Sequence, residues 1–166
     1  MLILGVDPGI AISGYGIIEK EQNGAKVLDY GVIRTDAKLD TAQRLKIIYE
    51  SYLKLIEKYK PSTVAVEELF FNKNAKTIIS VSQARGAALL AAALSDLEVS
   101  EYTPLQVKQS VVGYGRASKA QVQEMVKLFL KLDEIPKPDD AADALAVAIC
   151  HLHSYKLQSI LDGRGY

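Results

Sequence analysis

Cysteine and histidine are scarce in this sequence, which contains one of the former and two of the latter. The lone cysteine, Cys150, excludes an intrachain disulfide and a cysteine-based zinc site. We expect it to be buried in a helix as a small apolar side chain. His151 and His153 lie in a polar stretch near the end of the chain, so we expect them to be exposed and to hold no metal.

An excess of charge of either sign is also lacking. The 20 basic and 20 acidic residues give a formal net charge of zero. Strongly basic chains are drawn to the phosphates of nucleic acids, and the total charge here does not indicate such a partner. The location of the charges can still favour one, because binding needs only a local excess.

Long apolar runs are missing as well. The longest, residues 87–94, is far shorter than the ~18 residues that a membrane-spanning helix requires. No basic segment precedes the first apolar run, which ends at Asp7, so we expect no signal peptide. Together with the single cysteine, these features predict a cytoplasmic protein with no membrane partner.

The residues that are present suffice for one folded domain. The chain has 166 residues, 49% of them hydrophobic and 24% charged, which allows a substantial core but leaves little room for a second domain. We find no repeat, low-complexity tract or linker. We therefore expect a single domain over residues 1–155 and a short C-terminal tail over residues 156–166.

Hydrophobic periodicity predicts an α/β fold. Short apolar or alternating runs over residues 2–7, 14–20 and 26–35 are typical of an antiparallel meander of strands. A helix from Thr41 to just before Pro61 leads into a β-branched strand at 63–67, which favours a parallel crossover. We expect a fifth strand at 98–102 and further helices at 75–95, 104–111, after Ser118 and from 139 to 155.

Two acidic residues stand at the ends of apolar strands. Asp7 closes the first strand and Glu67 closes the strand at 63–67. If these strands are parallel neighbours, both carboxylates emerge at the edge where open α/β sheets usually bind ligands. The alternative for Asp7 is a simple turn residue, because Pro8-Gly9 follows it.

Two further acids, Asp140 and Asp143, are three residues apart on the last predicted helix and share one of its faces. Their neighbours are mostly alanine, and a charge on such a face is costly without a counter-ion. Asp139 stands four residues before Asp143 and could share the same face. Either Asp139 or Asp140 could instead only cap the helix.

Four carboxylates in one place would repel one another, and some would keep a proton near neutral pH. A hard divalent cation removes this conflict, and oxygen ligands without cysteine or histidine suit Mg²⁺ or Mn²⁺. Two such ions ~3.5–4 Å apart can activate a water molecule and stabilise the leaving oxygen of a phosphodiester. The acids therefore indicate metal-dependent phosphoryl chemistry.

Positive charge is concentrated in two stretches, residues 69–95 and 102–123, which contain no acidic residue and together carry +6, while the rest of the chain carries −6. Such stretches can follow a phosphate backbone, although any single lysine is more simply a solvated surface charge. The six basic residues are Lys73, Lys76, Arg85, Lys108, Arg116 and Lys119.

Phe70 and Phe71 follow Glu67 closely and precede a polar segment. An aromatic ring in such a loop can stack on an unpaired base, a contact worth ~1–3 kcal/mol. The alternative is that it anchors the loop to the core.

Five short motifs occur in order along the chain, and together they resemble the bacterial RuvC family of Holliday junction resolvases from residue 2 to about residue 155. They are Asp7-Pro8-Gly9, Ala65-Val66-Glu67, Gln83-Ala84-Arg85-Gly86, the segment from Val107 to Gly113, and the segment from Asp140 to Ala146.

The resemblance implies a ribonuclease-H-like fold with a five-stranded mixed sheet in the order 3-2-1-4-5. It implies a homodimer that binds four-way junction DNA and nicks two opposed strands symmetrically, in homologous recombination and DNA repair. It also implies work with the RuvA–RuvB branch-migration complex.

For the site, the resemblance implies two Mg²⁺ ions, replaceable by Mn²⁺, on Asp7, Glu67, Asp140 and Asp143. Because Asp140 begins the matching motif, we prefer it and assign Asp139 to capping. The resemblance places Lys108 and Lys119 beside the scissile phosphate and lets Phe70 stack on DNA at the junction.

Two other functions fit parts of the sequence. Actin-like ATPases and sugar kinases also carry an early Asp-x-Gly, but they duplicate the core, for which 166 residues are too few. A non-catalytic junction-binding module would use the same basic stretches, yet it would gain nothing from acids placed beside phosphates.

Overall fold

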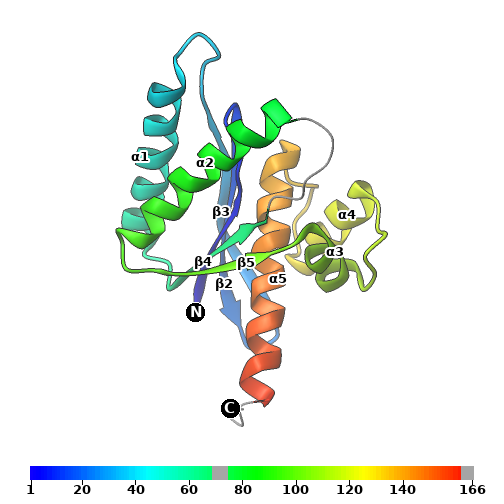
Figure 1. Ribbon diagram of the computed structural model, residues 1–166. Coiled ribbons are helices and arrows are strands. Elements are labelled where there is room, and N and C mark those ends of the chain that lie inside the picture. The colour runs from blue at the N-terminus through cyan, green and yellow to red at the C-terminus, as the bar shows by residue number, and fades with distance from the viewer. Residues whose placement is uncertain (69–74, 162–166) are drawn as a thin grey trace.

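The computed structural model describes residues 1–68 and 75–161. They form a five-stranded mixed sheet in the order β3-β2-β1-β4-β5, flanked by helices (Figure 1). This confirms the predicted fold class and strand order. The elements are β1 (Leu2–Asp7), β2 (Ile12–Glu21), β3 (Gly24–Arg34), α1 (Thr41–Tyr59), β4 (Thr63–Glu67), α2 (Ala75–Ala93), β5 (Glu98–Tyr102), α3 (Pro104–Val112), α4 (Lys119–Phe129) and α5 (Asp139–Leu161).

β1 is the central strand of the sheet. It pairs antiparallel with β2, where Asp7 is opposite Gly14, and parallel with β4, where Val6 is opposite Val66. β5 continues the parallel half, since it pairs parallel with β4. The carboxyl ends of β1, β4 and β5 therefore share one edge of the sheet.

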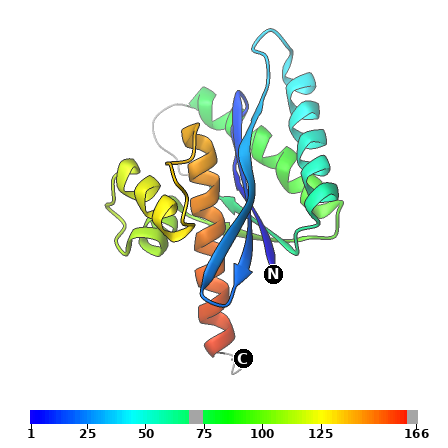
Figure 2. The same cartoon turned by 180° about the vertical axis from the view of Figure 1, so that it is seen from behind.

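Helices cover both faces of the sheet (Figures 1 and 2), so its central strands are buried on both sides. On one face, Leu4, Val6 and Val66 pack with α1 and α2. On the other, Ile3 and Ala65 pack with α3, α4 and α5. The alternation follows from the two-residue period of a strand, and it explains why β1 and β4 read as continuous apolar runs.

Small residues let α5 approach the sheet closely. A Cβ added at Gly5 would lie 2.2 Å from the carbonyl oxygen of Ala144, and one added at Gly14 would lie 1.9 Å from that of Asp140. The facing residues of α5 are alanines that are fully buried. The amino-terminal turn of α5 is thereby held against β2 beside the end of β1.

Side-chain caps fix the starts of three helices. Asp40, Thr103 and Ser118 each accept a hydrogen bond from the backbone N–H of a glutamine three residues later, and each glutamine side chain bonds back. These capping boxes satisfy backbone groups that a helix start leaves unpaired.

α5 ends at Leu161, beyond the expected end at Tyr155, because residues 156–161 contain neither glycine nor proline.

The prediction of exposed histidines is wrong. His151 is 7% exposed, and its Nδ1 lies 2.8 Å from the Tyr102 hydroxyl of β5. His153 is half-buried, 3.1 Å from Ser110 Oγ and edge-on to Phe129. Both histidines lie on the side of α5 that α3, α4 and β5 cover. Their polar neighbours in the sequence do not indicate this burial. Cys150 is buried, as expected.

No helix within residues 1–68 and 75–161 is both long enough and apolar enough to cross a membrane.

Candidate active site

Two carboxylates project from neighbouring strand ends. Asp7 is the last residue of β1 and Glu67 the last of β4, and the parallel pairing of Val6 with Val66 brings them to the same edge. Both strands are buried up to the acid itself. The sheet thus carries each carboxyl group to the boundary of the core, as the sequence predicted.

α5 supplies two more carboxylates from its first turns. Asp140 lies where the helix backbone touches Gly14, the residue opposite Asp7 in the sheet. Asp143, three residues on, is partly buried, with 29% of its side chain exposed. Close packing of an alanine-rich helix on a glycine-containing strand is what allows these acids to reach the sheet edge.

The charges of these four residues act on one another. Burial, and then the charges of Glu67, Asp143 and Asp140, raises the pKa of Asp7 to about 8. Burial, and then the charge of Asp143, raises the pKa of Glu67 to about 7. Burial also raises the pKa of Asp143. The structure therefore brings Glu67, Asp140 and Asp143 close enough to Asp7 for their charges to oppose its ionisation.

Lys119 is the main cation at this edge. Its Nζ lies 2.9 Å from Asp143 Oδ2 and 3.3 Å from Asp139 Oδ2. It lowers the pKa of Asp7, of Glu67 and of Asp143, in each case against the larger effect of burial. Lys108 of α3 also lowers the pKa of Glu67. Both lysines that the family resemblance places beside the scissile phosphate lie near these carboxylates.

Asp139 differs from Asp140 in its surroundings. Its side chain is 61% exposed, and bonds to Gln123 and Lys119 lower its pKa. Asp140 is among the charges that raise the pKa of Asp7, whereas Asp139 is not. As the first residue of α5, Asp139 also meets the positive end of the helix dipole. The geometry therefore favours Asp140 as the fourth member of the carboxylate group.

The four acids fit a hard divalent cation by chemistry, since they offer only carboxylate oxygens. Burial and then neighbouring charges raise the pKa of Asp7 and Glu67, and a bound cation would favour the ionised form of both carboxyl groups. Within the described ranges, however, no three histidine, cysteine or acidic side chains are drawn together tightly enough to hold one ion. In the metal-free protein, Asp143 is instead paired with Lys119 through its Oδ2 atom.

The remaining predicted DNA contacts have mixed outcomes. Arg85 of α2 forms an ion pair with Glu101 of β5, and only 19% of its side chain is exposed. This pairing ties α2 to the sheet through Nη2 of Arg85, whereas its Nε is buried and has no hydrogen-bond partner among the described residues. Arg116 is exposed in the loop before α4. Phe70, Lys73 and the side chain of Lys76 lie outside the described residues.

Two buried hydroxyl groups next to Asp7 were missed. Tyr52 of α1 and Ser13 of β2 are hydrogen-bonded at 2.7 Å, and both are almost completely buried. The sequence counts Tyr52 only as an apolar position of α1. Nothing in the sequence pointed to the pair, because Ser13 lies outside the strand predicted at 14–20, whereas β2 begins at Ile12.

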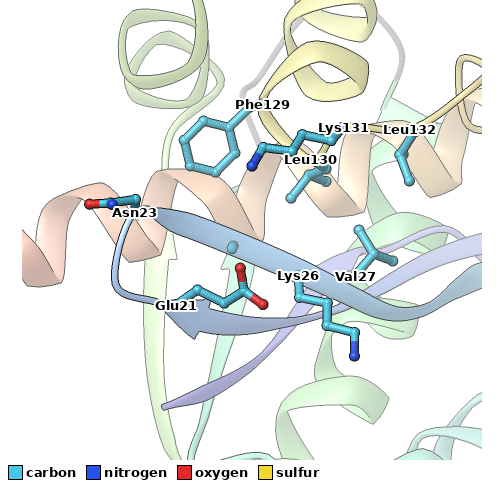
Figure 3. Close-up of a pocket in the computed structure, with 9 residues that line it drawn as sticks. Glu21, Asn23, Lys26, Val27, Phe129, Leu130, Lys131 and Leu132 are labelled. Carbon is cyan, nitrogen blue, oxygen red and sulfur yellow. The ribbon is translucent and has the colours of Figure 1, made fainter.

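A cavity of about 210 Å³ lies at the opposite end of the sheet (Figure 3). It separates the β2–β3 hairpin, including Glu21 and Lys26, from Phe129, Leu130 and Leu132 at the end of α4. It contains none of the predicted site residues. The chemistry of the carboxylate group is therefore located at an open sheet edge and not in this cavity.

Comparison with known proteins gives concordant matches. A family model described as crossover junction endodeoxyribonuclease RuvC matches residues 3–151. A crossover junction endodeoxyribonuclease RuvC of Alkaliphilus metalliredigens is 61% identical over 160 residues, which are 96% of this chain and 98% of that protein.

Two solved structures of Thermus thermophilus RuvC have the same fold. The one in complex with a Holliday junction substrate has a TM-score of 0.91 at 36% identity and covers 96% of this chain and 97% of its own. The other has a TM-score of 0.88 at 35% identity, over 95% and 97%.

Proposed function

The chain belongs to the RuvC family of crossover junction endodeoxyribonucleases, and we propose that it cleaves four-way DNA junctions at a site built on Asp7, Glu67, Asp140 and Asp143. The observation that carries the proposal is the convergence of these acids from β1, β4 and α5, with the pKa of Asp7 raised to about 8. Carboxylates in a purely structural role are usually paired with cations or exposed to water, and neither description fits the buried carboxyl groups of Asp7 and Glu67.

We assign the four acids to divalent metal binding, with two Mg²⁺ ions per site and Mn²⁺ as a substitute. When bound, such ions activate a water molecule and stabilise the leaving oxygen of a phosphodiester. Burial and then the charges of nearby acids raise the pKa of Asp7 to about 8 and that of Glu67 to about 7, so in the metal-free protein both keep a proton at a higher pH than ordinary carboxyl groups do. Binding a cation therefore releases protons from these two residues.

Lys119 and Lys108 lie where they can orient the scissile phosphate of the DNA. Lys119 Nζ contacts Asp143, and Lys108 is close enough to Glu67 to lower its pKa. An ammonium group at this edge attracts a backbone phosphate towards the carboxylates. We assign Arg116, exposed before α4, Lys73 and Lys76 to contacts with more distant phosphates and Phe70 to base stacking. Arg85 is the weakest member of the predicted set, because its side chain is mostly buried and one of its nitrogens is paired with Glu101.

The proposed enzyme is a homodimer that nicks two opposed strands symmetrically. α2 exposes the apolar side chains of Ile79 and Leu90, to 60% and 52%, and Leu94, which directly follows the helix, is 64% exposed. Nothing lies within 4 Å of a Cβ added at Gly86 on the same helix. An interface at these side chains would place two active sites about a two-fold axis, which matches the symmetry of a four-way junction.

Family membership supports the wider setting. We propose that the enzyme acts in homologous recombination and DNA repair, together with a RuvA–RuvB branch-migration complex, in the cytoplasm. These assignments depend on the family and not on the geometry of the site.

Structure selectivity tests the proposed activity. With Mg²⁺ present, the protein should nick a synthetic four-way junction in two opposed strands and leave a linear duplex of the same sequence intact. Tight junction binding without cleavage in either Mg²⁺ or Mn²⁺ would instead identify a non-catalytic binding module.

A further inference from the structure

A buried tyrosine links α1 to the strand that faces Asp7. The Tyr52 hydroxyl lies 2.7 Å from Ser13 Oγ and 3.1 Å from the carbonyl oxygen of Gly14. Ser13 Oγ in turn lies 3.4 Å from the carbonyl oxygen of Asp7. Tyr52 is 1% exposed and Ser13 is 0% exposed, so water does not compete for these bonds.

The network has fewer protons than contacts. Each hydroxyl carries one proton. One proton occupies the short contact between Tyr52 and Ser13, and the other is donated to the carbonyl of Gly14 or of Asp7. The two side chains thus act as one unit that binds either backbone group of a single pair, because Asp7 and Gly14 are opposite each other in the sheet.

Both ends of this unit are backbone groups of the active site. Asp7 carries a site carboxylate directly. Gly14 is the residue against which the Asp140 backbone packs, as the 1.9 Å approach of its added Cβ to the Asp140 carbonyl shows. Tyr52 therefore holds the point at which the end of β1, strand β2 and the first turn of α5 meet.

The core alone does not require these hydroxyl groups. The face of α1 that carries Tyr52 also carries Ile48 and Ile56, and a phenylalanine would fill the same buried space. A buried hydroxyl is costly unless it is bonded, so an apolar side chain would be the simpler choice for packing. The polar pair makes sense if its directional bonds, and not only its volume, are needed.

We propose that Tyr52 and Ser13 are positioning residues that set the spacing between the carboxylates of Asp7 and Asp140. This inference rests on the proposed function, because it takes those two acids as metal ligands. Loss of either hydroxyl leaves the fold intact but lets the two acids move relative to each other. Catalysis is sensitive to such movement, and a misplacement of ~1 Å can cost ~100-fold in rate.

The test compares Tyr52→Phe, Ser13→Ala and the double variant with a matched control, Tyr59→Phe. Tyr59 is on the same helix, and its hydroxyl donates a 2.5 Å bond to Asp29 Oδ2, remote from the site. Each variant is measured in three ways: single-turnover nicking of a four-way junction against Mg²⁺ concentration, junction binding without metal, and Mn²⁺ binding to the DNA-free protein by electron paramagnetic resonance.

We expect Tyr52→Phe to slow nicking about 10-fold and to weaken Mn²⁺ binding, while junction affinity stays within about twofold of wild type. Ser13→Ala should behave alike, and the double variant should lose no more than either single one, since the pair acts as a unit. Tyr59→Phe should match wild type in rate and in Mn²⁺ binding.

Wild-type nicking and Mn²⁺ binding in both Tyr52→Phe and Ser13→Ala would overturn the positioning role, as would an equal loss in Tyr59→Phe. An Asp7→Asn variant is assayed alongside to separate the two proposals. If it is inactive while Tyr52→Phe is normal, only the positioning role fails. If Asp7→Asn cleaves at the wild-type rate, the proposed site fails and the positioning role fails with it.

Discussion

Lys119 Nζ lies 2.9 Å from Asp143 Oδ2, so a lysine of α4 neutralises a carboxylate of α5 at the edge of the sheet where Asp7 and Glu67 end their strands. The same ammonium group lowers the pKa of both Asp7 and Glu67. In the metal-free protein, Lys119 thus supplies part of the positive charge that the acids need. If a divalent cation took over this role at Asp143, the Lys119 ammonium group would be available to a phosphate.

Replacing Lys119 by methionine should slow junction nicking by about 10- to 100-fold, because a positive charge near the reacting phosphate is lost. Binding of Mn²⁺ to the DNA-free protein should not weaken, since a competitor for Asp143 is removed. Single-turnover rates and Mn²⁺ titrations check both statements. Lys127→Met, on the same helix, is the control and should retain the wild-type rate. Weakened Mn²⁺ binding in the Lys119 variant would mean that the lysine supports the metal site instead.

The pH dependence of stability follows from the raised pKa values of Asp7 and Glu67. The ordinary values are 3.8 and 4.5, and the folded values are about 8 and about 7. Between these limits the folded state binds more protons than the unfolded state, so the free energy of unfolding falls as the pH rises. The metal-free protein should lose on the order of a few kcal/mol from this source between pH 4 and pH 8.

Thermal unfolding across that pH range, with and without Mg²⁺, measures the effect. Mg²⁺ should restore stability most at high pH, where the carboxylates are ionised. Asp7→Asn should unfold at a higher temperature than wild type at pH 8 without metal. A metal-free wild type whose stability rises from pH 4 to pH 8 would show that these acids are not strained by burial and repulsion.

Asp139 and Asp140 can be separated by single substitutions. Asp140→Asn should reduce nicking by about 100-fold or more, because it removes a proposed metal ligand. Asp139→Asn should retain activity within a few-fold, since its carboxylate is exposed and pairs with Lys119. Single-turnover nicking of the same junction decides the matter. The reverse pattern, a dead Asp139 variant and an active Asp140 variant, would reassign the fourth ligand.

Gly14→Ala should destabilise the protein, because the added Cβ would lie 1.9 Å from the Asp140 carbonyl and would push α5 from the sheet. A cost of about 1–3 kcal/mol or more in the free energy of unfolding is expected for such overpacking. Gly86→Ala is the control, compared at protein concentrations at which the proposed dimer is dissociated: it adds a Cβ in open space on helix α2 and should be neutral or stabilising by about 0.5–1 kcal/mol. Denaturant unfolding compares the two. Equal stability of the two variants would contradict the close contact.

If the dimer interface is on α2, charged substitutions there should lower the average mass of the protein in solution. Leu90→Glu combined with Leu94→Glu places charges at these exposed apolar positions and should weaken dimerisation by about 10-fold or more. Leu128→Glu, on the similarly exposed outer side of α4, should leave the dimer intact. Sedimentation equilibrium gives the association constants. Dissociation by Leu128→Glu alone would move the interface to α4.

The correct predictions of the site acids and helix caps depend on patterns within short segments of the chain. Asp7 and Glu67 each follow an apolar run, so the register of two parallel strands was enough to bring them together. Asp140 and Asp143 share a helix face by spacing alone. The capping residues Asp40 and Ser118 also act within one turn of chain.

What the sequence did not reveal depends on contacts between distant segments. From the sequence, Arg85 is an unpaired cation, whereas in the fold it forms an ion pair with Glu101 of β5. His151 reads as polar surface until Tyr102 and α3 cover it. From the sequence, Tyr52 is one more apolar core position, and only the fold shows that its hydroxyl bonds to Ser13 of β2. In each case a partner 16 to 49 residues away decides the role, and periodicity carries no information about it.

The central claim is that the carboxylates at the ends of β1 and β4 perform metal-dependent cleavage of a four-way junction. The most direct measurement is nicking of one synthetic junction by wild type, Asp7→Asn and Glu67→Gln, with and without Mg²⁺, at protein concentrations that saturate junction binding. We expect paired nicks by wild type with Mg²⁺ only, and none by either variant although both bind the junction. Nicking by wild type without any divalent metal, or by both variants at the wild-type rate, would contradict it.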